Sequence, residues 1–248
     1  MRGGARLLVI DEIDLSLDAA AQVHLLTKLR VFCQQYSCNV LFTTHSMAMM
    51  RTLAPTELLY MERRDTGTEL SSVSYSYIKA LLFGFADWDK YILTEDQVAF
   101  EFVEVVIQRY CREIFYRYKI IYIGGGPQVA DLLRRNEREQ FLSSPENVIA
   151  ILDGDQKGIA YTHHPHIHFL PVNSVEDALL HHYNGADFPN KLPAGVTFNG
   201  GAKHLFNMLQ SSHVMSRTEI YSLLCERGGV PLSEFVEVLK GFLSPTVN

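Results

Sequence analysis

Two aspartates separated by one glycine follow an apolar run in the second half of the chain. Residues 148–152 are mostly branched and apolar and predict a buried strand, and Asp153, Gly154 and Asp155 come directly after it. Ligands of α/β proteins usually bind at the carboxyl ends of parallel strands. Neighbouring carboxylates without a counter-charge repel one another, and their hard oxygen atoms suit Mg²⁺ or Mn²⁺. The pattern therefore indicates either a divalent-cation site or an ordinary turn, because Asp-Gly also favours turns.

Other acids and glycines follow further predicted strands of the same half. The apolar residues 91–94 end in Glu95 and Asp96, and a strand over 119–123 ends in a glycine run, 124–126. A strand over 168–171 leads to Glu176. Helices are expected between these strands, over 97–110 and 128–141. This alternation predicts a compact parallel sheet of the α/β class.

A second set of candidate chemical residues lies near the start of the chain. The apolar residues 6–10 end in Asp11 and Glu12, and a helix is expected from Asp18 to about residue 36. A strand over 39–43 then leads to His45. Phosphoryl transfer needs a cation, an oriented water and groups that stabilise the leaving charge, and these residues could supply part of each. The alternatives are a solvated acidic turn and a loop histidine.

Composition excludes several classes of protein. The chain has 248 residues, 47% hydrophobic and 20% charged, which suits about two small domains with apolar cores. No apolar stretch is long enough to span a bilayer, and the four cysteines have neither paired nor metal-finger spacing, so we expect a reduced, cytoplasmic setting. The net charge of −6 means that nucleic acid would have to be bound by a local basic face or through metal.

Several remaining features have two interpretations each. Lys157 could stabilise charge beside the aspartates or be a loop lysine. Arginines on the 128–141 helix could meet phosphates or simply be solvated. The four histidines of 163–168 could hold zinc or nickel, although strand alternation puts only some of them on one face. Lys203 could approach the acids from the helical region 202–243. The arginines of the 128–141 helix mentioned above are Arg134, Arg135 and Arg138.

The first block resembles the second half of an ABC-type ATPase. The resemblance implies that Asp11 is the Walker B acid near Mg²⁺, Glu12 the base, Asp18 part of the D-loop and His45 the switch histidine. No G-x-x-x-x-G-K-[ST] motif occurs, so the phosphate cradle is missing, and residues 2–4 are interpreted as the last remnant of the family's signature loop. We therefore expect a truncated or naturally split ATPase that binds ATP only if the missing half is supplied.

The second block resembles a TOPRIM domain, the metal-binding fold shared by topoisomerases, primases and OLD (overcoming lysogenization defect) nucleases. The resemblance rests on ILTEDQVAF, IIYIGGGPQV, AILDGDQKG and NSVED. It implies that Glu95, Asp153, Asp155 and Glu176 hold one or two Mg²⁺ or Mn²⁺ ions. Asp96 departs from the family pattern, because a glycine is expected after the glutamate. The turn there could differ, or an extra acid could join the site.

Together the two blocks resemble an OLD-family protein. The resemblance implies a metal-dependent endonuclease, with DNA favoured over RNA as substrate, often in bacterial anti-phage defence, and a homo-oligomer or a complex with another ATPase chain. The rival is a non-catalytic assembly or sensor subunit whose acids bind Mg²⁺ structurally. The expected domains are a partial ATPase over 1–77, including a hairpin of strands 57–62 and 69–77, a connector over 78–90, the TOPRIM domain over 91–183 and a helical region over 184–248.

Overall fold

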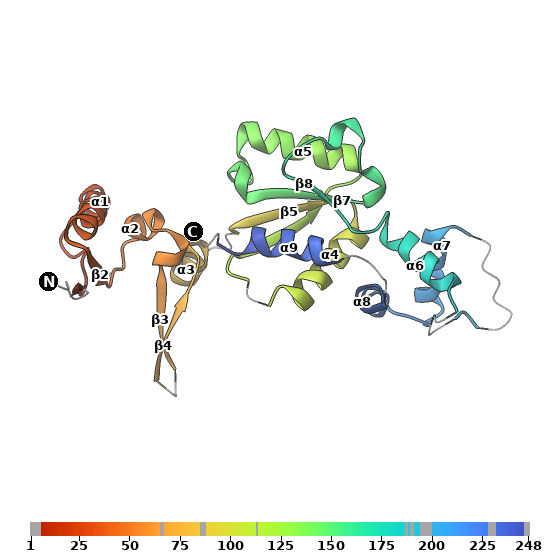
Figure 1. The fold of residues 1–248 in the computed structure, drawn as a ribbon, viewed down its shortest axis with the longest axis horizontal. Coiled ribbons are helices and arrows are strands. Elements are labelled where there is room, and N and C mark those ends of the chain that lie inside the picture. Colours follow the sequence, from red (N-terminus) through yellow and green to blue (C-terminus); the bar gives the residue numbers. More distant parts are fainter. Residues whose placement is uncertain are drawn as a thin grey trace. The chain divides into compact units, whose positions relative to one another are not determined.

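The computed structural model has mixed α/β structure with parallel sheets (Figure 1). It divides into two compact units, Met1–Asp87 and Trp88–Asn248, which we describe separately. No described helix is long and apolar enough to cross a membrane. The predicted signature-loop remnant at 2–4 lies outside the described residues. The structure describes residues 6–64, 67–84, 88–112, 114–186, 188, 191–193, 200–227 and 232–245.

The first unit begins with a parallel strand pair joined by a helix. Strand β1 (Arg6–Ile10) pairs in register with β2 (Cys38–Phe42), and α1 (Ala19–Tyr36) connects them. The side chain of Asp18 accepts a hydrogen bond of 2.8 Å from the N–H of Ala21, so Asp18 is the N-cap that starts α1. The predicted helix and both predicted strands are therefore present within a residue or two of their expected ends.

The rest of the first unit differs from the predicted hairpin in one respect. Strand β3 (Leu59–Arg64) pairs antiparallel with β4 (Gly67–Ser72) after the short α2 (Met47–Thr52) and the 3₁₀ turn η1 (Pro55–Glu57). Residues 75–77, predicted to be strand, instead begin helix α3 (Tyr75–Phe83). The reason is Ser74, whose hydroxyl accepts from the N–H of Tyr77 at 3.1 Å and caps the helix. The predicted connector over 78–90 thus starts inside α3, which belongs to the first unit.

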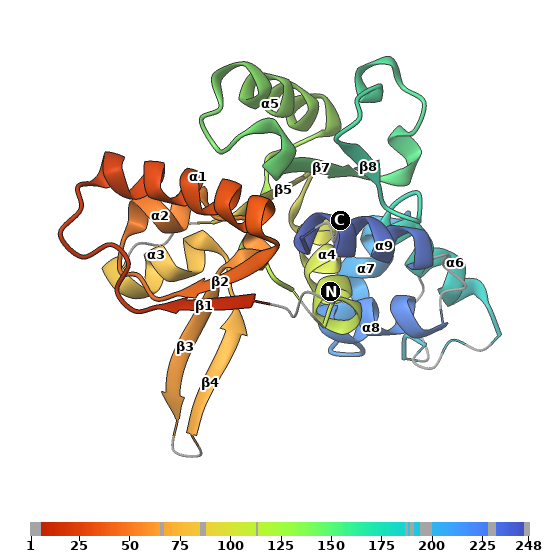
Figure 2. The same cartoon turned by 60° about the vertical axis from the view of Figure 1, so that its left-hand side comes forward.

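The second unit is built on a four-stranded sheet in which every pairing is parallel. The strand order is β6-β5-β7-β8, as Figure 2 shows in part. Helix α4 (Gln97–Tyr110) follows β5, and α5 (Gly126–Glu139) follows β6. The strands are β5 (Lys90–Thr94), β6 (Tyr118–Tyr122), β7 (Val148–Leu152) and β8 (Ile167–Phe169).

Strand β7 shows why this sheet is covered on both faces. All five of its residues are buried. Because side chains alternate along a strand, Ile149 and Ile151 join one hydrophobic cluster with α4, whereas Val148, Ala150 and Leu152 join another with α5. A continuous apolar run is therefore what a central parallel strand requires. This interpretation of 148–152 from the sequence is confirmed.

The remaining helices share the core on the α4 side of the sheet. They are α6 (Val175–Asn184), α7 (Ala202–Ser211), α8 (Arg217–Arg227) and α9 (Leu232–Leu243), with short 3₁₀ turns η2 (Pro145–Asn147), η3 (Gly154–Gln156) and η4 (Ala160–Thr162) in the preceding loops. Buried residues of α6, α7, α8 and α9 belong to the same cluster as α4. The C-terminal helices therefore form one core with the sheet.

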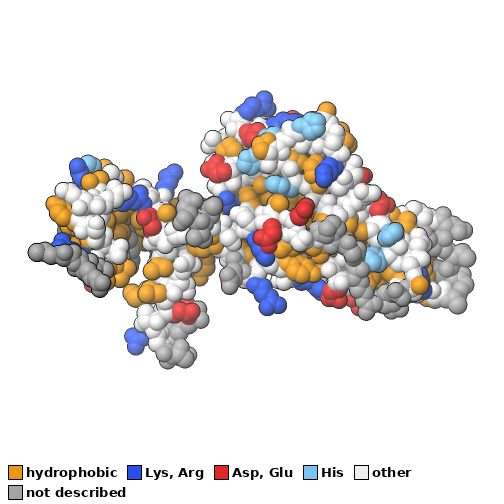
Figure 3. Space-filling model, viewed as in Figure 1, with side chains coloured by type: hydrophobic (Ala, Val, Ile, Leu, Met, Phe, Trp, Pro, Cys, Tyr) orange, Lys and Arg blue, Asp and Glu red, His pale blue; other side chains and the backbone are white. Residues whose placement is uncertain are grey.

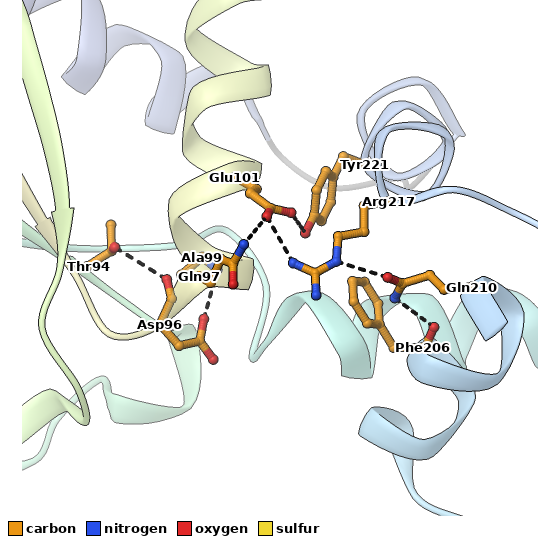
Figure 4. A network of polar contacts seen from close by, with 9 residues as sticks. All are labelled: Thr94, Asp96, Gln97, Ala99, Glu101, Phe206, Gln210, Arg217 and Tyr221. Atoms are coloured by element: carbon orange, nitrogen blue, oxygen red, sulfur yellow. Dashed lines mark hydrogen bonds and ion pairs between the residues drawn. The ribbon is translucent and has the colours of Figure 1, made fainter.

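A polar network fixes α8 against α4 within this core (Figure 4). The carboxylate of Glu101 accepts hydrogen bonds from Nη1 of Arg217 at 2.9 Å and from the hydroxyl of Tyr221 at 2.7 Å. The Nε of Arg217 also donates to Gln210 of α7 at 2.9 Å. Tyr221 is 1% exposed, so its hydroxyl has little water to replace a lost acceptor.

Removing this acceptor should destabilise the second unit. We expect Glu101→Ala to lower the free energy of unfolding by about 2 kcal/mol, because it leaves the buried Tyr221 hydroxyl and one face of Arg217 unpaired. Glu237→Ala is the matched control: it removes an exposed ion pair with Lys240 and should cost less than about 0.5 kcal/mol. Urea unfolding followed by circular dichroism measures both, and equal losses would contradict a structural role for Glu101.

Candidate functional site

The predicted acids converge where the strand order of the second unit reverses. From β5 the chain passes through α4 to β6 on one side, and then through α5 to β7 on the other side of β5. Ligands of open α/β sheets bind at the carboxyl ends of strands at such a reversal. Glu95 follows β5 and Asp153 follows β7 at this position. The topology alone therefore brings together two residues that are far apart in sequence.

Glu95 links the two central strands directly. Its Oε1 accepts a hydrogen bond of 2.9 Å from the backbone N–H of Asp153, and the N–H of Gly126, in the first turn of α5, also donates to its carboxylate. Burial raises the pKa of Glu95 above its usual value, although these two hydrogen bonds act in the opposite direction. Glu95 therefore holds the ends of β5 and β7 and the start of α5 in one place.

Asp153 is the electrostatic centre of the site. Burial, followed by the charges of Glu95, Asp96, Glu176 and Asp155, raises its pKa to about 8. At neutral pH and without a cation this carboxyl group therefore holds a proton, because ionisation would place another negative charge among existing ones. These five acids, which we call the carboxylate cluster, come from the ends of β5 and β7 and the start of α6.

Glu176 contributes to the cluster from the first turn of α6. It is only 6% exposed, and burial raises its pKa while the nearby charge of Lys203 lowers it. Ser174 starts the helix by accepting a hydrogen bond of 3.1 Å from the N–H of Asp177. Lys203, in the first turn of α7, is thus close enough to act electrostatically on Glu176. Its position depends on the packing of α7 against α6, which no local sequence pattern reveals.

Asp96, where the sequence comparison above expected a glycine, has a local structural role. Its Oδ1 accepts a hydrogen bond of 2.9 Å from the N–H of Ala99, which makes Asp96 the N-cap of α4 (Figure 4). Its charge also acts on Asp153. The aspartate therefore both starts the helix and adds negative charge to the cluster.

The loop after β7 is fixed by its glycine. The N–H of Gly154 donates to the carbonyl of Val172 at 2.9 Å, and a Cβ at Gly154 would lie 2.4 Å from that oxygen. Asp155 and Lys157 are exposed on the same loop, and Oδ1 of Asp155 accepts from Nε2 of Gln156 at 2.8 Å. A cavity of about 440 Å³ opens beside the loop, with Gly154, Lys157 and Asn173 among its walls. None of the five acids lines this cavity, so it offers space beside the loop and not within the carboxylate cluster.

The carboxylate cluster has suitable donors for a divalent cation, but they are not yet arranged around one point. Among the described residues, no three His, Cys, Asp or Glu side chains are grouped so that they could hold a metal ion together. Glu95, for example, directs Oε1 to a backbone N–H. The donor chemistry fits Mg²⁺ or Mn²⁺, because the acids supply only hard oxygens and repel one another. Binding would require side chains such as Glu95 to turn toward the ion.

The three arginines predicted to meet nucleic acid are mostly engaged within the protein. Arg134 donates to the carbonyl of Tyr161 at 2.6 Å, and Arg135 pairs with Glu139 at 3.0 Å. Of the three, only Arg138 is exposed and has no hydrogen-bond or ion-pair partner among the described residues. On the face of the second unit drawn in Figure 3, basic side chains are scattered among acidic ones. The helix therefore offers a weaker phosphate-binding face than its sequence suggests.

The histidines of 163–168, for which a zinc or nickel site was one of two interpretations, have contacts within the protein. Nε2 of His164 lies 2.8 Å from a carboxylate oxygen of Glu137, and its Nδ1 accepts from the N–H of His166 at 3.1 Å. Both ring nitrogens of His164 are thus occupied. Burial lowers the pKa of His168, which favours its neutral form. In the part of the chain that is described, these histidines form no group that could hold a metal ion.

In the first unit the candidate nucleotide residues lie at two adjacent strand ends. Asp11 accepts a hydrogen bond from the hydroxyl of Thr43, and that hydroxyl accepts from the N–H of Glu12 at 2.7 Å. His45 follows β2 and is exposed. Asp18 is used as the cap of α1. The parallel pairing of β1 and β2 thus places Asp11, Glu12 and His45 at the same edge.

The repulsion within the carboxylate cluster predicts a pH dependence of stability. The folded-state pKa of Asp153, about 8, lies above its ordinary value of 3.8, so its contribution is fully present below pH 4 and is lost as the pH rises to about 8. In EDTA, the melting temperature of the wild-type chain should therefore fall between pH 5 and pH 8.5. Asp153→Asn should make this fall smaller, so that at pH 8.5 the variant melts on the order of 3 °C higher than wild type. An unchanged slope in the variant would contradict this assignment.

No family model and no curated protein matches this chain. The functional assignment therefore depends on the geometry of the site and on the resemblance of its motifs.

Proposed function

We propose that this chain is a TOPRIM-type, OLD-like endonuclease that hydrolyses phosphodiester bonds of nucleic acid with a divalent cation. The observation that supports this proposal most directly is the convergence of Glu95, Asp153 and Glu176 at the strand-order reversal of a parallel sheet. A partly buried cluster of carboxyl groups is costly to ionise unless something neutralises it. DNA is the favoured substrate, and RNA is the alternative, because these residues would address phosphate and not the base.

Glu95, Asp153, Asp155 and Glu176 would hold the cation, one or two ions of Mg²⁺ or Mn²⁺. A cation bound there would polarise the scissile phosphate and lower the pKa of a water molecule. The four acids themselves would contribute the position of the cation and the negative charge that holds it. Glu95 and Asp153 are fixed by strands that are buried on both faces, whereas Asp155 lies on the exposed loop and could adjust to the substrate. No side-chain nucleophile is required.

Two lysines could bind the anionic substrate beside these acids. Lys203 already acts on the charge of Glu176, and Lys157 lines the cavity next to Gly154. A lysine at the phosphate would stabilise the extra negative charge of the transition state. Because Lys203 belongs to α7, this part of the helical C-terminal region would take part in the nuclease site.

The first unit is proposed to be a partial ABC-type ATPase module. Asp11, Glu12, Asp18 and His45 would serve ATP only when the missing half, with its phosphate-binding loop, is supplied. The proposed setting is bacterial, cytoplasmic and anti-phage, which rests on the resemblance alone. We expect no ATP hydrolysis by this chain in isolation.

A non-catalytic assembly or sensor subunit is the second candidate. The observation that favours it is the arrangement of the described acids, of which no three are grouped to hold an ion. In that case Mg²⁺ would stabilise the fold without supporting cleavage. The two candidates differ in whether loss of Asp153 changes an enzymatic rate.

Plasmid cleavage with Mg²⁺ or Mn²⁺ tests the nuclease directly. We expect the wild-type chain to nick supercoiled DNA and Asp153→Ala to reduce the rate by at least about 100-fold, because it removes the central carboxylate. Asp131→Ala, an exposed acid on α5, is the matched control and should cleave like wild type. Matched RNA substrates show which nucleic acid is preferred. If wild type and Asp153→Ala nick equally, the cleavage does not come from this site.

Lys203 should affect the rate more than cation binding. Lys203→Ala is expected to lower kcat about 10- to 100-fold, because it removes a positive charge beside the substrate phosphate, while Mn²⁺ affinity measured by calorimetry changes less than about threefold. Lys203→Arg should recover part of the rate. A loss of Mn²⁺ affinity equal to the loss of rate would show that Lys203 only supports the carboxylates.

A further inference from the structure

A cavity beside the edge strand β6 combines aromatic rings with positive charge. It has a volume of about 370 Å³ and shares no lining residue with the carboxylate cluster. That volume is within the usual range for a small-ligand site. The lining side chains that matter here are Trp88, Phe100, Tyr116, Arg117, Tyr118 and Lys119. We call this space the β6 cavity.

The cations of the β6 cavity are held in place and one of them lacks an acceptor. The guanidinium carbon of Arg117 lies 5.0 Å from the ring centroid of Trp88, and Nζ of Lys119 lies 5.5 Å from it. Nη1 of Arg117 is buried and has no hydrogen-bond partner within the described residues. A buried donor without a partner costs about 1–3 kcal/mol. A bound anion would supply the missing acceptor once the guanidinium turns Nη1 toward the cavity.

One acid in the wall indicates how a ligand would be oriented. Glu104 of α4 lines the same cavity. Its carboxylate would repel a phosphate but could accept a hydrogen bond from an N–H group of a nucleobase. The phosphate is therefore favoured near Arg117 and Lys119, and the base near Glu104 and the aromatic rings. Aromatic rings and arginine planes are the usual stacking partners of unpaired bases.

Aromatic side chains continue from the β6 cavity to the carboxyl edge of the sheet. Phe100 lines the cavity and contacts Tyr122 edge-to-face, with ring centroids 6.1 Å apart. Tyr122 is 56% exposed at the end of β6, opposite Thr94, which precedes Glu95. The strand from Tyr118 to Tyr122 covers roughly 13 Å. A few nucleotides would therefore reach from the cavity to the carboxylate cluster.

We propose that the β6 cavity binds one nucleotide of a single-stranded nucleic acid and guides the strand along β6 toward the carboxylate cluster. The guiding role rests on the proposed nuclease function, whereas binding in the cavity does not. The site would act independently of sequence, because stacking and phosphate contacts are available to every nucleotide.

The cavity contains its own reporter, because Trp88 is the only tryptophan of the chain. The full chain is titrated with the decanucleotide (dT)10 in EDTA, which prevents cleavage. We expect quenching of the Trp88 fluorescence, and a salt dependence of binding. The double variant Arg117→Ala/Lys119→Ala should bind at least about tenfold more weakly. Lys28→Ala/Lys240→Ala, with the same change in net charge, is the matched control and should bind like wild type.

Three results would overturn the site. The first is that anisotropy shows oligonucleotide binding while Trp88 fluorescence does not change. The second is that the two double variants bind with equal affinity. The third is that dTMP binds as tightly as (dT)10, which would indicate a free-nucleotide site. Lys119→Ala, at an exposed residue, is tested alone in case Arg117→Ala unfolds the chain, with circular dichroism as the control. If Trp88 fluorescence is quenched but the wild-type chain does not cleave DNA with Mg²⁺, the proposed nuclease function is wrong and the proposed binding site stands.

Discussion

The central constraint on the second unit is that carboxylates which repel one another are held together by a rigid sheet. Burial and four neighbouring acids raise the pKa of Asp153 to about 8. The strands cannot relieve this repulsion by moving apart, because β7 is buried on both faces and Glu95 is hydrogen-bonded to the backbone of Asp153. Such strain is stable only when the surrounding fold is stable enough to maintain it. This repulsion is the physical reason for proposing a cation at the site.

The packing around the cluster follows from the same requirement. Gly154 allows the loop after β7 to lie directly against the carbonyl of Val172, and this contact leads on to the capped start of α6, where Glu176 is buried. On the same side of the sheet, the ion pair between Glu101 and Arg217 attaches α8 to α4. The helices that lie beyond the sheet therefore restrict the acids indirectly. A fold without them would leave Glu176 exposed and lower the repulsion.

The sequence predicted those elements whose signals are local. Residues 97–110 were expected as a helix and form α4, because Asp96 caps an amphipathic segment, and the apolar run at 148–152 forms the central strand. Contacts between distant residues were not predictable in this way. The arginines of α5 were expected to have no partner within the protein, but Arg134 donates a hydrogen bond to the carbonyl of Tyr161 in another loop. Lys203 was named as a residue that could approach the acids, but its approach to Glu176 depends on the packing of α7 against α6. Residues 75–77 form a helix because Ser74 caps it, and the alternation of apolar residues does not detect such a cap.

The first unit presents the opposite physical situation, with apolar surface in place of concentrated charge. Leu7 and Val9 on one face of β1 are 64% and 65% exposed, and Leu8 on the other face is 42% exposed. Strands of a parallel sheet are normally covered on both faces, so a two-stranded parallel pair with such residues is an incomplete layer. The proposed ATPase role needs polypeptide beyond the described residues, in the same protein or in another, for two separate reasons. It must supply the phosphate loop, and it must cover these strands, so one partner surface could satisfy the chemical and the packing requirement together.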